Sequence, residues 1–335
     1  RGQQSPISAQ ATIQARKLRF RLSPNQSLTY SLFAQAAAEL NAARTDIEFK
    51  KIAVTVESQD TAAGTLNLAG TWPLSPSRPN GAITIGVKDL DTAPLAEIFR
   101  IFPGRDHGPL LLSAHVAIAG NSADGILSAQ GQETLGPIRL ARNRNNGEPN
   151  EATLHIEHNL SRHHDDIRAT VLTMTADRSG GRADRVTASG TVRLAGPPGV
   201  QLRGEIASLD AAWYASLFSH PEPMPPAKPK QTVESGSKIH RGQSTTPAIL
   251  TNLDAEMSIG SVSYGNLMLG PGRVTAKGTG DWLEATLEST GFAEGRVNAS
   301  VRLARQDRYQ DLTWSGNGQG LRVDTIMQAI EPGRE

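Results

Sequence analysis

Apolar and polar residues alternate with a period of two along most of the chain. Val54 and Val56 alternate with Thr55 and Glu57, and residues 28–40, 83–87, 253–259, 262–269 and 297–303 behave in the same way. A period of two places successive side chains on opposite faces of a strand. The pattern therefore predicts a mainly β protein whose strands have one apolar and one polar face.

One stretch carries two competing patterns. Residues 33–43 are rich in Ala, Glu and Leu, which favour a helix by intrinsic propensity. Apolar residues nevertheless occupy every second position from Leu28 to Leu40, and the alternation continues into the next segment. We therefore interpret residues 28–40 as a strand.

Three short segments change from a period of two to helical spacing. Each follows a strand and opens on an aspartate, namely Asp91, Asp210 or Asp324. A carboxylate at this position caps the free backbone N–H groups at the positive end of a helix. The spacing predicts short amphipathic helices over residues 92–102, 211–218 and 324–331.

These helices suggest repeated units, because a strand that begins with glycine precedes each of them. We expect a β-rich unit over residues 1–105, a second over 106–218 and a third over 248–335. The prolines of residues 219–247 and their few apolar side chains predict a disordered linker, and a shorter loop is expected over 142–150. The predicted architecture is an extended or curved antiparallel sheet with a few short helices.

Composition is consistent with a thin core, since 38% of residues are hydrophobic and 4% aromatic, with 32 Gly and 20 Pro. The 34 basic and 33 acidic residues nearly cancel, so no long-range field would attract nucleic acid. The chain has no Cys, which excludes disulfides and Cys-based zinc sites. The longest apolar stretch, residues 109–120, is too short to cross a bilayer, so any membrane anchor is expected outside this chain.

One segment is dense in potential metal ligands. It contains His155, His158, His163, His164, Asp165 and Asp166. Strand parity places His155 and His158 on opposite faces, with residues 161–166 as the turn, so we interpret the segment as a surface hairpin, with a metal site as the alternative. The chain also lacks a nucleophile elbow and a phosphate-binding loop. We expect no enzymatic activity, no metal and no cofactor.

The order of glycine-started strand, alternating strand, Leu-Asp pair and short amphipathic helix resembles the repeating units of the AsmA/TamB group of bacterial envelope proteins. The resemblance is most evident over residues 248–335, in the stretches 253–269, 283–289 and 294–303. The Pro-rich segment 219–247 and the His-rich turn depart from that family's pattern. The resemblance implies a fragment of a periplasmic protein that is held in the inner membrane by a helix outside this chain.

The function implied by this resemblance is non-enzymatic. A β-groove would bind or conduct phospholipid between the inner and outer membranes and so support outer-membrane biogenesis, with acyl chains as the ligand and envelope proteins of both membranes as further partners. Eight side chains are predicted to face the groove: Ile83, Ile85, Val192, Leu194, Val297, Ala299, Val301 and Leu303. For each of them, ordinary core beneath a helix is the alternative. The alternative function is a structural β-repeat scaffold or protein-binding module with a closed core and no lipid.

Overall fold

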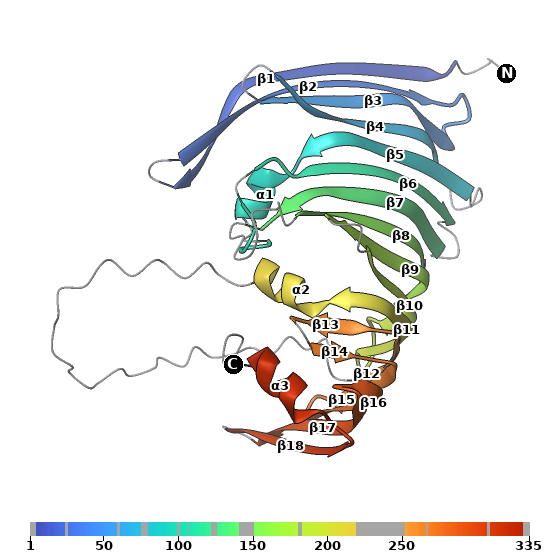
Figure 1. Ribbon diagram of the computed structural model, residues 1–335. Coiled ribbons are helices and arrows are strands. Elements are labelled where there is room, and N and C mark those ends of the chain that lie inside the picture. Colours follow the sequence, from blue (N-terminus) through green and yellow to red (C-terminus); the bar gives the residue numbers. More distant parts are fainter. Residues whose placement is uncertain are drawn as a thin grey trace.

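The alternating segments form one β-sheet of 18 strands, with three short helices on one side of it (Figure 1). This computed structural model describes residues 5–23, 26–58, 61–74, 80–98, 101–106, 108–121, 126–140, 151–179, 183–218, 252–265, 267–306 and 309–330. The predicted mainly β fold with an extended, curved and mostly antiparallel sheet is confirmed. The predicted linker 219–247 and loop 142–150 lie outside the described residues.

The elements follow one another in chain order. The first group is β1 (Ile7–Ser23), β2 (Gln26–Leu40), β3 (Asp46–Ser58), β4 (Thr61–Pro73), β5 (Asn80–Asp91) and α1 (Ala93–Ile98). The second group is β6 (Leu111–Asn121), β7 (Ile126–Arg139), β8 (Glu151–His163), β9 (Asp166–Arg178), β10 (Ala183–Arg193), β11 (Gly199–Asp210) and α2 (Ala211–Phe218). The third group is β12 (Asn252–Ile259), β13 (Val262–Tyr264), β14 (Leu267–Leu269), β15 (Gly272–Thr279), β16 (Trp282–Phe292), β17 (Gly295–Gln306), β18 (Tyr309–Gln319) and α3 (Val323–Ile330).

Strands β1 to β11 pair antiparallel, each with its neighbours in the chain. Strand β12 then pairs with β11 in parallel, which requires the chain to cross over, and α2 begins that crossover. Antiparallel pairing resumes through β15, β16, β17 and β18. The sheet is therefore continuous across the predicted unit boundaries, and the division into three units stays a prediction.

Two predicted elements differ in extent. The helix predicted over 92–102 is shorter, because α1 ends at Ile98 and Phe102 has a left-handed φ of 56°. Pro103 follows Phe102, and a residue before proline avoids the helical region. The stretch 262–269 is not one strand but the small hairpin β13–β14, because Gly265 takes a φ of 60° and reverses the chain.

Other elements agree with the sequence pattern. The Ala-rich segment 28–40 lies within β2 despite its helical composition, and α2 spans the predicted residues 211–218. The predicted helix over 324–331 corresponds to α3, of which Glu331 lies outside the described residues. Neighbours on both sides hold β2 in the sheet, so tertiary pairing outweighs helix propensity there.

The buried core is small and lies where α1 and α2 pack on the sheet. Trp213 and Leu217 of α2 are 2% and 1% exposed, and both belong to one hydrophobic cluster together with Ile138 of β7. The other buried members are Ala93, Ala96, Leu110, Ala152, Leu154 and Ala176. We call the face of the sheet that carries this cluster the inner face and the opposite one the outer face.

Candidate functional site

Cross-strand register aligns the inner-face residues into rows that run across the sheet. Three neighbouring rows cross every strand except β13 and β14. The first reads Ala9, Ala38, Phe49, Gly70, Ile83, Ile118, Ala129, Leu160, Ala169, Gly190, Leu202, Ala255, Ala276, Ala285, Val301 and Trp314. The second reads Ala11, Ala36, Ile52, Leu68, Ile85, Val116, Gly131, His158, Leu172, Ala188, Gly204, Met257, Val274, Leu287, Ala299 and Gly316. The third reads Ile13, Ala34, Val54, Leu66, Val87, Ala114, Glu133, Ile156, Met174, Val186, Ile206, Ile259, Gly272, Ser289, Val297 and Gly318.

These three rows form an almost unbroken apolar strip. Strands lie about 4.8 Å apart, so the strip follows the sheet for about 70 Å. Most of its side chains are half-buried, because neighbours flank them within the sheet and no second layer formed by the described residues covers most of them. At the C-terminal end the exposure is high, with Val301 44% and Trp314 76% exposed. An apolar surface of this extent is far larger than most soluble monomers leave bare.

All but one of the eight predicted groove residues lie on the inner face. Ile83, Val301, Ile85, Ala299 and Val297 belong to the three rows, and Val192 and Leu303 share the same face at neighbouring register positions. Leu194 lies beyond the end of β10 and is 53% exposed. None of the eight belongs to the core cluster beneath α1 and α2, which disfavours the interpretation as helix-covered core.

The three aspartates at the helix starts lie in different positions. Asp210 precedes α2 and its Oδ1 accepts a hydrogen bond from the Trp213 N–H at 3.0 Å. The Oδ1 of Asp91 accepts from the N–H of Ala93, the first residue of α1, at 3.0 Å. Asp324 instead lies within the first turn of α3, where it pairs with Arg322, and this guanidinium lowers the pKa of Asp324. All three stabilise helix ends and lie away from the apolar strip.

The docking of α2 also buries charge. Arg178 forms ion pairs with Asp184 at 3.1 Å and with Asp210 at 2.5 Å. Asp184 is 2% exposed, and burial raises the pKa of its carboxyl. Because Asp184 Oδ1 also accepts the Asp210 N–H, the cluster ties the sheet to the start of the helix. Arg178 Nη1 donates to Asp210 and Nη2 donates to Asp184, which supports a structural role for the cluster.

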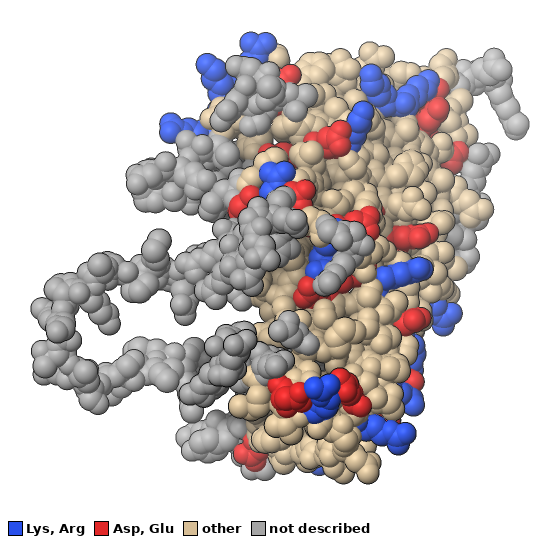
Figure 2. Space-filling view, viewed as in Figure 1, with Lys and Arg blue, Asp and Glu red and all other residues tan. Residues whose placement is uncertain are grey.

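The outer face is polar and wetted. Arg203 pairs with Asp254 at 2.9 Å, and Glu256 bridges Arg203 and Arg273 across three strands. On the side of the molecule drawn in Figure 2, which includes the helices, acidic and basic side chains are intermingled in small groups with no large patch of one sign. The two faces of the sheet therefore differ sharply in polarity.

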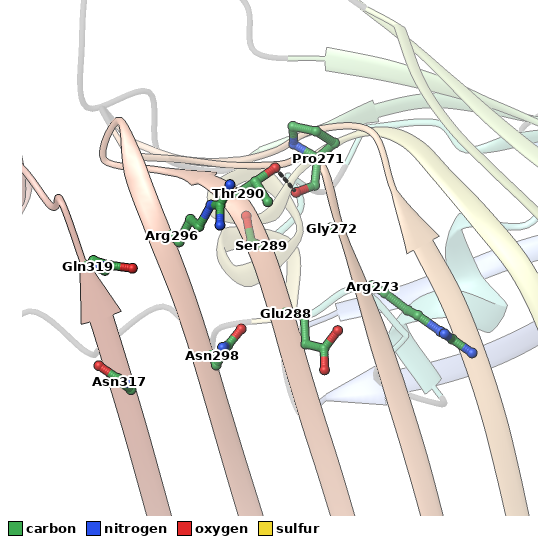
Figure 3. Close-up of a pocket in the computed structure, with 10 residues that line it drawn as sticks. All are labelled: Pro271, Gly272, Arg273, Glu288, Ser289, Thr290, Arg296, Asn298, Asn317 and Gln319. Atoms are coloured by element: carbon green, nitrogen blue, oxygen red, sulfur yellow. Dashed lines mark hydrogen bonds between the residues drawn. The ribbon is translucent and has the colours of Figure 1, made fainter.

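A shallow outer-face pocket of about 470 Å³ lies across β15 to β18 (Figure 3). Side chains from adjacent strands line it, including Arg296, Glu288 and the directly paired Asn298 and Asn317. Its lining is that of an exposed sheet surface, with polar groups open to water. It is a weaker candidate than the inner face, which has apolar surface that water solvates poorly.

The His-rich segment forms the predicted hairpin of β8 and β9, and the turn is limited to His164 and Asp165. His155 and His158 lie on opposite faces, as parity predicted. His155 Nε2 lies 3.2 Å from Asp177 on the outer face, whereas His158 Nδ1 lies 3.2 Å from Glu133 on the inner face. Among the described residues, no group of three or more acidic, His or Cys side chains could hold a metal.

The sequence reasoning missed the pairing of Glu133 with His158. Each residue interrupts an alternating apolar pattern, in 127–135 and in 154–160, and these interruptions were the available signal. Their meeting depends on the register of β7 and β8, which shifts between Leu135 and Ile138. The sequence pattern alone does not define that register.

Comparisons with protein-family models, with curated proteins and with solved structures found no match. Within the described ranges, no helix has the length and apolar character needed to span a membrane.

Proposed function

We propose that this protein binds the acyl chains of phospholipids along its inner face, as a non-enzymatic β-groove of a bacterial envelope protein. The observation that carries the proposal is the apolar strip of three rows, which crosses the sheet and which the described part of the chain leaves uncovered over most of its length. Hydrocarbon is the occupant that such a surface stabilises without needing polar partners.

The side chains of the strip suit a flexible, poorly defined ligand. Ala, Val, Ile and Leu dominate it, and glycine interrupts it at several positions, so its surface offers few directional contacts. A protein that recognises one compact molecule usually combines an enclosed pocket with several polar groups. A long open strip fits chains that move along it, and we propose transfer of phospholipid between the inner and outer membranes as the process it serves.

The proposal is tested by extracting lipid from the purified protein and quantifying it by mass spectrometry. We expect phospholipid to co-purify in defined amounts. Val301→Asp should lower that amount, because hydrocarbon laid over the carboxylate would remove its water, which costs free energy. Thr313→Asp is the matched control, since Thr313 lies on the outer face of the adjacent strand β18. A protein that carries no lipid would instead support a scaffold or protein-binding module.

A further inference from the structure

The three rows of the inner face contain just two ionisable residues within the described chain, and these are neighbours. Glu133 lies in the third row and His158 in the second, on the adjacent strands β7 and β8. The residues around them are apolar: Ile156 and Leu160 on the same strand, Leu172 on β9 and Val116 on β6. Within the described residues, a single ionisable point therefore interrupts the three rows.

The geometry of this point is specific. His158 Nδ1 lies 3.2 Å from Glu133 Oε2, and the two side chains are 13% and 19% exposed. Gly131, which pairs with His158 across the strands, leaves room for the ring: a Cβ there would lie 2.6 Å from His158 Cε1 and 2.9 Å from Glu133 Oε1. Glycine at 131 is thus a condition for the pair to occupy this position.

The pair leaves hydrogen-bonding capacity unused. Among the described residues, neither His158 Nε2 nor Glu133 Oε1 has a hydrogen-bond partner. When the imidazole is protonated, Nδ1–H donates to the Glu133 carboxylate and Nε2–H remains available as a donor. Hydrocarbon laid over the pair would remove water from that donor without replacing its hydrogen bond, which is costly.

From this arrangement we propose that the Glu133–His158 pair is a binding point for an oxygen acceptor of the lipid, either an ester carbonyl or a phosphate oxygen. The inference rests on the proposed function and deepens it. The acyl chains lie on the apolar rows to either side, and Nε2–H of His158 donates to the oxygen at the boundary between head region and chains. Glu133 orients the imidazole and offsets its charge.

A purely structural link between β7 and β8 is the competing explanation. His155 supplies such a link on the outer face of the same strand, where it pairs with Asp177 and lies 3.2 Å from Thr134 Oγ1. Its side chain is 46% exposed, so water satisfies its remaining hydrogen bonds. His155→Gln is therefore a matched control for His158→Gln.

The test measures retention of three lipids by the purified protein at one fixed pH. A diacyl phospholipid has both oxygens, its ether-linked counterpart keeps the phosphate without ester carbonyls, and diacylglycerol keeps the carbonyls without phosphate. We expect His158→Gln to weaken retention of the diacyl phospholipid about tenfold, as loss of a charge-assisted hydrogen bond predicts. If the ether lipid shares this loss and diacylglycerol does not, the acceptor is the phosphate. If diacylglycerol shares it and the ether lipid does not, the acceptor is the ester carbonyl.

If His158→Gln retains each lipid as well as His155→Gln and the unmodified chain do, the proposed binding point is wrong. The proposal that the inner face binds lipid is unaffected by that result. Failure of the unmodified chain to retain any lipid overturns both proposals. Folding of the variants is checked by circular dichroism. The unmodified chain gives an independent readout, because its His158 ring resonance should shift on addition of phospholipid while that of His155 does not, and an unmoved His158 resonance contradicts the inference.

Discussion

Tyr214 shows how burial alters the chemistry of a single residue in this fold. Tyr214 belongs to α2, and its hydroxyl is buried without a hydrogen-bond partner among the described residues. Its ring contacts Trp213 edge-on with centroids 4.9 Å apart. Burial, followed by the negative charge of Asp184, raises the pKa of Tyr214 to about 12. An unfolded tyrosine ionises near pH 10.

The consequence is a loss of stability at alkaline pH. Between about pH 10 and 12 the unfolded chain releases the Tyr214 proton while the folded chain keeps it, so the free energy of unfolding falls as pH rises. Tyr214→Phe should reduce this fall and change stability little at pH 7, because the hydroxyl has no partner to lose. Urea unfolding at pH 7, 10 and 11.5 measures the effect, and parallel pH profiles for both proteins would contradict it.

A second prediction at the residue scale concerns the substitution of Gly131. Gly131→Ala forces the His158 ring to move and should cost about 1–3 kcal/mol of folding free energy, the usual range for overpacking. Gly86 is the matched control, since a Cβ added there meets nothing within 4 Å. Gly86→Ala should be neutral or stabilising by up to about 1 kcal/mol. Equal unfolding midpoints in urea for the two variants would show that the ring is not confined as described.

At the scale of elements, helix α2 anchors the small core. Trp213 is 2% exposed and packs with Leu217 against the end of the inner face. Trp213→Ala should cost about 3–5 kcal/mol, because a large aromatic side chain leaves a cavity. Leu95→Ala on α1 should cost less than about 1 kcal/mol, since Leu95 is 51% exposed. Denaturant unfolding compares them, and similar losses would mean that α2 is not the anchor.

The local pattern of apolar and polar residues predicted most of the strands and helices. A period of two identified strands even in the Ala-rich segment 28–40, because alternation reports which face is buried and propensity does not. Aspartates followed by helical spacing located the starts of α1, α2 and α3 to within two residues. The early end of α1 and the β13–β14 hairpin were missed, since Pro103 and Gly265 act through backbone angles that a hydrophobic pattern does not contain.

The candidate site was predictable only in part. Parity along one strand predicted which residues face inward. The rows themselves depend on the register between strands, including strands far apart in sequence, as where Leu202 of β11 pairs with Ala255 of β12. Strand bulges shift that register at several places, among them Ala37/Ala38 and Leu135/Ile138. The Glu133–His158 pair depends on this long-range alignment.

At the scale of the whole molecule, the described part of the sheet ends at β1 on one side and at β18 on the other. Within the described residues, β1 and β18 each pair with a strand on one side only. The stretch of β1 from Ile7 to Ala15 has no charged residue and no proline, the usual features that protect an edge from pairing with other chains.

We therefore expect Gln10→Lys, at an outer-face position of β1, to reduce concentration-dependent self-association of the purified chain. A lysine on an edge strand opposes edge-to-edge pairing, whereas Asn67→Lys on the interior strand β4 should have little effect. Sedimentation velocity over a range of protein concentrations measures the outcome. Unchanged association in the Gln10→Lys protein would place the contact elsewhere than the β1 edge.

The central claim is that lipid hydrocarbon lies on the inner face and not on the outer one. Its most direct test places a photoreactive amino acid at successive positions of β17, one per variant, and measures cross-linking to phospholipid. The account predicts strong cross-links at Ala299 and Val301 and weak ones at Ser300 and Arg302, a period of two that follows the strand. Equal labelling at both parities, or none at any position, would contradict the account.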